Sequence, residues 1–366
     1  MSEYLQIILL LAVVWELAYH WLFWSKLALR EPKVYPETTQ GVSVVIAARN
    51  EEKQLQKLIT TLFEQDHPDF EVMVVNDRSD DNSQTLLEKL QAKYDRLKVH
   101  EVKELPQGWT GKKHAVFQGI HRSEKPLILL TDADCLPVSS QWIRQMTGYF
   151  ADSTQFILGF SPYRKYPGIL NQWIQFETLH TGLQYLSSAL AQVPYMGVGR
   201  NLAYRKELFI KQGFGGDQTF VGGDDDVFVN QHATGTNTRV NYGAASQMLS
   251  EPKKTWKEYF IQKIRHLSAG KRYHIKDQTR LGLFSLATMV GWLLFLYLLV
   301  SNQMKDWILI LFVCRSLSFY SIFTLSGQKL NIKLAYWALP LFDLCYTISY
   351  PVVGLVALTA KRIKWS

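Results

Sequence analysis

The chain has 366 residues, of which 47% are hydrophobic and 20% are charged, and its net charge at pH 7 is +8. This composition excludes disordered, collagen-like and low-complexity proteins, and the length allows one large domain with attachments or two medium domains. Three scattered cysteines, Cys135, Cys314 and Cys345, are too few for a disulfide scaffold or a cysteine zinc cluster, which indicates a reducing compartment.

The first predicted element is an N-terminal transmembrane helix within residues 1–25. Residues 5–24 are twenty mostly apolar residues, enough to cross a hydrocarbon core of about 30 Å as a helix. A cleaved signal peptide is the alternative, but no basic segment precedes the run and no small-residue cleavage site follows it. Lys26, Arg30 and Lys33 follow the run, so its C-terminal end is expected to face the cytoplasm.

From Gly41 onward, short apolar runs alternate with helix-like segments. The runs are Val42–Ala48, Glu71–Asn76, Leu97–Val102 and Leu127–Leu130, and the intervening helices are expected near 51–65, 83–94 and 112–122. Strands that alternate with helices indicate βαβ units, with a parallel sheet and right-handed crossovers. The predicted fold class of this region is therefore α/β.

Carboxylates follow three of the predicted strands. Glu51 comes after the first strand, Asp77 after the second, and Asp132 and Asp134 after the fourth. Ligands of such sheets lie beyond the carboxyl ends of the strands, so these acids predict a cleft for a hard cation and a hydroxyl-rich ligand. One acid of the Asp-x-Asp pair can accept bonds from a ribose or base, and the other can hold Mg²⁺ or Mn²⁺ on diphosphate oxygens. Two solvated turn carboxylates are the alternative.

Residues 169–195 carry apolar side chains at helical spacing. Packing into a protein core is one interpretation of this stripe. The other is a hydrophobic wall that faces a lipid acceptor.

Residues 251–280 form a basic region with interspersed aromatic residues. Segment 252–280 holds nine Lys or Arg residues against Glu258 and Asp277, a net charge of +7, and it includes Trp256, Tyr259 and Phe260. This composition predicts an amphipathic helix that lies on an anionic bilayer surface. A nucleic-acid site is the alternative, and it predicts steeply salt-dependent binding.

Residues 281–360 are expected to form a C-terminal membrane region with two to three spans. Its apolar runs are 281–300, 307–325 and 334–360. Arg315 and Asp343 lie within the last two runs, and they either pair between adjacent helices or, in the alternative, contact a lipid head group. Three spans after a cytoplasmic domain conflict with the basic tail Lys361, Arg362 and Lys364, which the charge rule keeps inside.

Seven motifs follow one another in an order that resembles a known family. They are SVVIAARNEE, VVNDRSDDNS, GWTGKKHA, TDADC, VGRNLAYRK, GGDDD and QKIRH. Over residues 41–270 the chain resembles family 2 glycosyltransferases of the GT-A fold, and most closely the membrane-attached members that glycosylate ceramide, hopanoids or carotenoids. The resemblance implies a Rossmann-like, mostly parallel GT-A domain at 41–250, flanked by transmembrane helices.

The resemblance also implies roles for residues on the donor side. Asp77 matches the acid that binds a uracil ring, and Lys112, with Ala115, matches the KxxA element beside the diphosphate. Asp134 matches the metal ligand, for Mg²⁺ or Mn²⁺. The other matching positions are Ala48 and Glu51 at the nucleotide-binding edge, Asp132 as the nucleotide-side acid, and Gly199, Arg200 and Asn201 along the donor sugar.

Two further motifs match the catalytic and acceptor sides. Asp225 matches the catalytic base, and Asp224 precedes it where many members have Glu. Gln262, Arg265 and His266 match the QxxRW element at the diphosphate and the acceptor, with His in place of Trp.

The resemblance therefore implies an inverting, metal-dependent hexosyltransferase that moves a sugar from a nucleotide-sugar, first of all a UDP-sugar, to a membrane lipid hydroxyl. The expected location is integral to a membrane, the inner one in a bacterium, with the catalytic domain on the cytoplasmic face. Neither a nucleic acid nor an obligate protein partner is expected. A processive polysaccharide synthase and a non-enzymatic nucleotide-binding membrane sensor are the alternatives.

Overall fold

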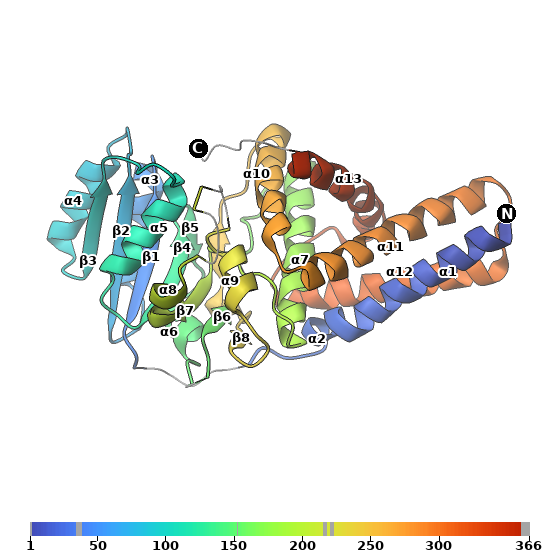
Figure 1. The fold of residues 1–366 in the computed structure, drawn as a ribbon, viewed down its shortest axis with the longest axis horizontal. Coiled ribbons are helices and arrows are strands. Elements are labelled where there is room, and N and C mark those ends of the chain that lie inside the picture. The colour runs from blue at the N-terminus through green and yellow to red at the C-terminus, as the bar shows by residue number, and fades with distance from the viewer. Residues whose placement is uncertain (1, 34–38, 152, 215–217, 220–222, 360–366) are drawn as a thin grey trace. The chain divides into compact units, whose positions relative to one another are not determined.

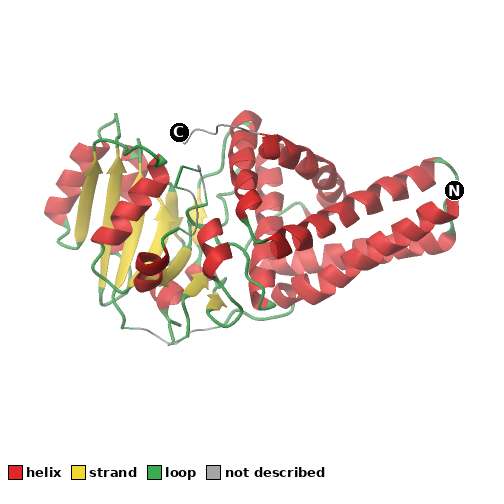
Figure 2. Ribbon diagram, viewed as in Figure 1, coloured by secondary structure: helices red, strands yellow, loops and turns green. Residues whose placement is uncertain are grey.

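The computed structural model describes the whole chain except residues 1, 34–38, 152, 215–217, 220–222 and 360–366. The chain divides into two compact units, each of which is described by itself. The helical unit comprises 1–31, 165–191 and 254–360, and the α/β unit comprises 32–164 and 192–253. The described strands, drawn in yellow in Figure 2, all fall within the residue ranges of the α/β unit.

The α/β unit is built on a seven-stranded sheet with the order β3-β2-β1-β4-β7-β6-β8. Its strands are β1 (Val42–Ala48), β2 (Phe70–Asp77), β3 (Leu97–Val102), β4 (Leu127–Asp132), β6 (Phe156–Leu158), β7 (Leu202–Arg205) and β8 (Thr238–Val240), and its helices are α3 (Glu52–Phe63), α4 (Ser83–Lys93), α5 (Gly111–Arg122), α6 (Trp142–Thr147), α8 (Lys206–Gln212) and α9 (Asp226–His232). A second, two-stranded sheet pairs β5 (Cys135–Pro137) with β9 (Met248–Ser250).

The first four strands of the large sheet are parallel, as the alternation of strands and helices predicts. Strand β1 pairs with β2 and with β4, and β2 pairs with β3, all in parallel. The register sets Ala48 opposite Asn76 and Ala47 opposite Asp132. The carboxyl ends of β1, β2 and β4 therefore lie side by side, which brings together the loops that carry the predicted site residues.

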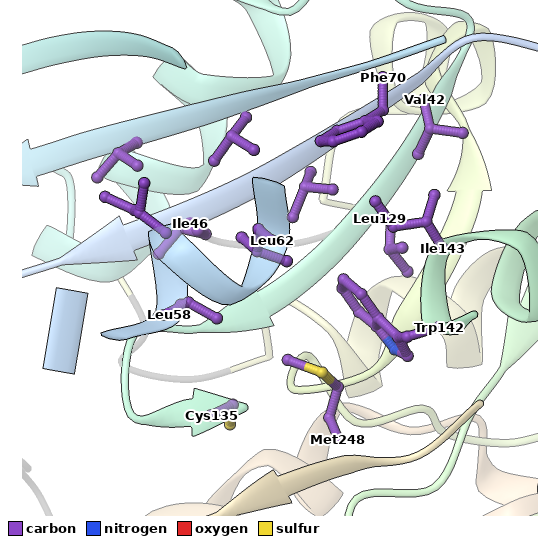
Figure 3. Close-up of a cluster of buried hydrophobic side chains, with 14 of the residues drawn as sticks. Val42, Ile46, Leu58, Leu62, Phe70, Leu129, Cys135, Trp142, Ile143 and Met248 are labelled. Atoms are coloured by element: carbon purple, nitrogen blue, oxygen red, sulfur yellow. The ribbon is translucent and has the colours of Figure 1, made fainter. Parts of the chain in front are cut away.

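The core of this unit lies between the sheet and its helices. On α3, the side chains of Leu55, Leu58, Ile59 and Leu62 repeat at helical spacing and are fully buried. They pack against β1 and β2 in a cluster that runs from Phe70 at one end to Met248 and Cys135 at the other (Figure 3). Helix α5 packs on β1 and β2 from the opposite face, where Gly119 allows it to approach Val45 closely. The sheet is thus covered on both faces, as parallel sheets generally are.

The helical unit consists of long helices and short connecting turns. Its elements are α1 (Ser2–Tyr19), the π-helical turn η1 (His20–Trp24), α2 (Ser25–Ala28), α7 (Ile169–Leu190), α10 (Trp256–Ala269), η3 (Gly270–Arg272), α11 (Ile275–Val300), α12 (Asp306–Lys329), η4 (Tyr336–Ala338) and α13 (Leu339–Thr359). Within the part of the chain that the structure describes, four helical segments are long and apolar enough to cross a membrane: Glu3–Ala28, Ile275–Val300, Asp306–Lys329 and Tyr336–Ala357. The basic tail 361–366 lies outside the described residues.

A buried ion pair joins two of these apolar helices. The guanidinium of Arg315 on α12 contacts the carboxylate of Asp343 on α13, which confirms the predicted pairing, and Arg315 is only 1% exposed. Sequence reasoning missed a third member, Glu16 on α1, whose Oε2 lies 2.7 Å from Arg315 Nη2. A charge buried among apolar helices is stabilised by such partners. The triad therefore links α1, α12 and α13.

Helix α7 belongs to the helical unit, although the sequence predicts one continuous domain over 41–250. It packs against η1, α2, α12 and α13, and most of its side chains are buried, including Phe176, Leu179 and Leu183. The apolar stripe predicted within 169–195 thus packs into a protein core, the first of the two interpretations.

Candidate active site

Lys112 is the charged centre of the site in the α/β unit. It lies in the first turn of α5, and its Nζ is 2.8 Å from Asp132 Oδ1 and 3.7 Å from Asp224 Oδ2. Burial disfavours the charged amine, but Asp132, Asp224 and Asp225 together raise the pKa of Lys112. Lys112 therefore stays protonated and brings the end of β4 close to the segment before α9. The neighbouring Lys113 is instead buried near the Phe214 ring.

Asp134 is the carboxylate best suited to hold a cation. It forms no ion pair within 4 Å among the described residues, whereas Asp132 is paired with Lys112. Burial and then the charge of Asp132 raise the pKa of Asp134, as expected of an acid that lacks a cationic partner. No described group of three or more His, Cys, Asp or Glu side chains is arranged to hold a metal ion. Mg²⁺ and Mn²⁺ need no such cage, because substrate phosphates complete their coordination, so this donor set fits such an ion.

Glu51 lies near the same acids, at the turn between β1 and α3. Burial, followed by the charge of Asp134, raises the pKa of Glu51 to about 7. Its backbone N–H donates to Ser83 Oγ at 3.2 Å, which fixes the turn. The acids predicted at the ends of β1 and β4 therefore share one region of negative charge, a suitable site for a cation.

Asp225 is held in place by the backbone. The N–H of Gly199 donates to Asp225 Oδ2, and the N–H of Asp226 donates to Oδ1 at 2.8 Å. Burial and then the charge of Asp224 raise the pKa of Asp225, while Lys112 opposes the rise. The structure thus shows an oriented carboxylate of increased basicity at the start of α9. Asp226 has a separate contact, since its own carboxylate accepts the N–H of Val227.

The segment Gly199-Arg200-Asn201 contributes in three different ways. Gly199 binds Asp225, and Arg200 stacks 4.4 Å from the Tyr163 ring, with a buried Nη1 that has no hydrogen-bond partner in the described part of the chain. Asn201 is fully buried, and both ends of its side-chain amide are held within the protein: the NH₂ group donates to two carbonyl groups, and Oδ1 accepts from Trp142 Nε1 at 3.0 Å. We therefore expect Asn201 to position this segment and Arg200 to reach a ligand.

Asp77 is buried and already paired within the protein, and its role at a uracil ring remains a prediction. Its side chain is fully buried, and both of its oxygens accept bonds of 2.8 Å from the guanidinium of Arg78. Arg78 itself has the unusual backbone angle φ of 53°. Contact between a uracil ring and Asp77 therefore requires Arg78 to move, a competition that the sequence alone did not indicate. Ala48 is buried at the end of β1, where only its backbone can serve a ligand.

The remaining predicted residues lie on α10, in the helical unit. Gln262 and Arg265 are half-buried and His266 is exposed. The helix begins with a capping box, in which Thr255 Oγ1 accepts the N–H of Glu258 and the Glu258 carboxylate accepts the N–H of Thr255. The role of these three residues at a diphosphate or an acceptor remains a prediction.

Gly199→Ala is expected to reduce activity by displacing Asp225. A Cβ at position 199 would lie 2.9 Å from Asp225 Oδ2, which is closer than ordinary van der Waals contact, so the carboxylate must shift. We expect a loss of about a hundredfold in turnover, comparable to removing a general base. Gly243→Ala is the matched control, because its Cβ would meet its neighbours at 3.5 Å or more. Equal turnover in the two variants would contradict the placement of Asp225.

Comparison with known proteins gives a consistent family match. Residues 43–213 match the model of glycosyl transferase family 2. The chain is 27% identical over 233 residues to the probable glycosyltransferase YdaM of Bacillus subtilis, covering 61% of this chain and 54% of that protein. It is 33% identical over 109 residues to a beta-monoglucosyldiacylglycerol synthase of Trichormus variabilis, covering 28% of this chain and 23% of the synthase. The matches thus span about half or less of these relatives.

One solved structure resembles the chain over nearly its whole length. It is a mannosyltransferase from Pyrobaculum calidifontis in complex with GDP-Man and Mn²⁺, with a TM-score of 0.65 at 17% identity, covering 97% of this chain and 99% of that one. At this low sequence identity, the similarity is evidence for the fold alone. It confirms the predicted GT-A fold class.

Proposed function

We propose, from the premise that the chain contains a family 2 glycosyl transferase domain at residues 43–213, that it transfers a sugar from a nucleotide-sugar to a hydroxyl group of a membrane lipid. The observation that supports this proposal most directly is the arrangement around Lys112. This residue contacts Asp132 and Asp224 and interacts with the charge of Asp225. Such a transfer needs a site that binds the donor and a general base. The acidic pair at the end of a parallel strand can serve as the first, and the oriented carboxylate on another segment can serve as the second.

On the donor side, Asp132 and Asp134 would bind the nucleotide-sugar. Asp134 would hold a divalent cation, Mg²⁺ or Mn²⁺, which neutralises the leaving diphosphate when bound. Lys112 adds a positive charge to the same region, and Arg200 has an unpartnered Nη1 with which it can donate to the donor. A UDP-sugar is the donor that the resemblance at Asp77 favours.

On the acceptor side, Asp225 would act as the general base. A lipid hydroxyl is a weak nucleophile, and its proton must leave as the new glycosidic bond forms. Asp225 can take that proton, because its carboxylate is deprotonated above its raised pKa and is oriented by two backbone N–H groups. A single displacement inverts the anomeric configuration, so we propose an inverting hexosyltransferase.

Three observations support a lipid acceptor. Four segments are able to span a membrane by length and composition, and one relative is named for the synthesis of monoglucosyldiacylglycerol. Helix α10 exposes Trp256, Phe260 and Ile261 in a segment rich in lysine and arginine. Such a helix is suited to a bilayer surface, where a lipid hydroxyl is available.

The proposal is tested by mass spectrometry of lipids from cells with and without the protein. We expect one lipid class to gain the mass of a single hexose residue when the protein is present. A ladder of masses would favour the processive polysaccharide synthase instead. Unchanged lipids together with nucleotide-sugar binding and no donor turnover would favour the membrane sensor.

The catalytic domain is expected on the cytoplasmic face, because basic residues flank the spans on that side. In a chain whose Cys314 and Cys345 are replaced by alanine, His121→Cys places an exposed thiol on α5, while Cys135 is buried. Only a membrane-permeant reagent should label this thiol in intact cells. Labelling by an impermeant reagent would reverse the orientation. The same method applied to Ser366→Cys, outside the described residues, determines on which side the basic tail lies.

A further inference from the structure

A small buried polar network adjoins Asp134, the predicted metal ligand. Strand β5 continues from the Asp132-Ala133-Asp134 turn, and it pairs antiparallel with β9 so that Cys135 lies opposite Ser250. Cys135 is fully buried, and Ser250 and Ser161 are each 1% exposed. Figure 3 shows Cys135 near Met248, at the end of the core cluster. The neighbours of Cys135 include polar side chains as well as apolar ones.

The contacts form a continuous chain of polar atoms. Cys135 Sγ is 3.4 Å from Asp134 Oδ1 and 2.9 Å from Ser250 Oγ, which is 3.1 Å from Ser161 Oγ. Ser161 donates its own proton to the carbonyl of Met248. Ser250 has a single proton, which it can donate either to Ser161 or to the sulfur of Cys135. When it donates to the sulfur, its contact with Ser161 carries no hydrogen bond, and the thiol proton goes to the carboxylate of Asp134. Every proton in this arrangement has an acceptor.

The two acids of the turn are therefore held by different partners. Asp132 is paired with the amine of Lys112 at 2.8 Å, whereas the partner of Asp134 is the neutral thiol of Cys135. A weak neutral donor orients a carboxylate but leaves its negative charge available. This is the relation that an outer hydrogen-bond partner has to a metal-binding carboxylate.

We propose that Cys135, supported by Ser250, is a positioning residue that orients the carboxylate of Asp134 toward a divalent cation. The proposal rests on the proposed function, because it assumes that Asp134 binds the cation. Cys135 would not act as a nucleophile, since it is fully buried and its hydrogen-bond partners among the described residues include no His side chain. Its contribution would be the affinity of the site for the ion.

The test measures Mn²⁺ binding in the purified full chain, with UDP present, from the electron paramagnetic resonance signal of free Mn²⁺. Cys135→Ala removes the donor, and we expect Mn²⁺ affinity to fall by about tenfold or more. Cys135→Ser retains a proton donor of similar size and should bind nearly as well as the wild type. Cys314→Ala, which removes an exposed cysteine elsewhere, is the control for loss of a thiol.

The outcomes separate this proposal from the proposed function. Wild-type affinity in Cys135→Ala would overturn the positioning role while leaving the cation site intact. No Mn²⁺ binding by the wild type would overturn the cation site and the positioning role together. If thermal melting shows that Cys135→Ala does not fold, Ser250→Ala decides by the same measurement, because it keeps the thiol and removes the hydroxyl that contacts it. Weaker Mn²⁺ binding supports the role, and unchanged binding overturns it.

Discussion

Asp225→Asn is expected to lower turnover by at least about a hundredfold, the lower range for loss of a general base, while nucleotide-sugar binding is retained. The amide keeps the shape of the side chain but cannot accept the proton of the acceptor hydroxyl. Steady-state kinetics with a lipid acceptor, together with titration of UDP binding, separates the two effects. We expect kcat to fall and the affinity for UDP to stay close to that of the wild type.

The neighbouring acids are matched controls for this prediction. Asp224 contacts Lys112, and the carboxylate of Asp226 accepts the N–H of Val227, so Asp224→Asn and Asp226→Asn test structural roles within the same acidic triplet. If Asp225→Asn is active while one of these two is dead, the base has been assigned to the wrong residue. If all three variants are active, a base-assisted displacement is wrong.

The pH dependence gives an independent measure of the same group. Burial and then Asp224 raise the pKa of Asp225, and a base acts only when it is deprotonated. Turnover should therefore fall as the pH is lowered through this raised pKa, at a pH above the usual range of an aspartate. The residual turnover of Asp225→Asn should lack this acidic limb. An unchanged acidic limb in the variant would assign it to another group.

Asp134→Ala is expected to abolish turnover, and excess chelator should do the same to the wild type. Asp134 is the acid of the Asp-x-Asp pair that has no ion-pair partner in the described residues, so the cation would depend on it. Mn²⁺ or Mg²⁺ added back should restore the chelated wild type but not the variant. Asp95→Ala, at an exposed acid of the same unit, is the control. Full activity in excess chelator would contradict the metal assignment.

The strands and the edge on which the site lies could be predicted from the sequence, because their physical signals are local. Val42–Ala48 is a short, mostly apolar and β-branched run, as expected of a buried parallel strand, and the structure forms β1 over these residues. Once the strands are parallel, their carboxyl ends must share one edge. Asp132 and the turn after Ala48 are neighbours for that reason.

The contacts within the site could not be predicted, because they join segments that are far apart in the chain. Nothing in the local pattern indicates that Lys112 contacts Asp224, or that Gly199 donates its N–H to Asp225. The hydrogen bonds of Cys135 could not be predicted for the same reason, since Ser250 lies on β9, which is far from Cys135 in the sequence. Arg78 follows Asp77 directly in the sequence. However, no sequence pattern indicates the backbone angle φ of 53° at Arg78, with which its side chain folds back onto Asp77.

The most direct test of the central claim is transfer by the purified protein reconstituted in vesicles that contain candidate lipids with free hydroxyl groups. Each vesicle preparation is incubated with Mn²⁺ and one nucleotide-hexose at a time, and the lipids are then examined by mass spectrometry and by nuclear magnetic resonance of the anomeric proton. The account predicts a lipid that carries one hexose with the anomeric configuration inverted relative to the donor, formed by the wild type and not by Asp225→Asn. A product with retained configuration, or equal product from Asp225→Asn, would contradict it.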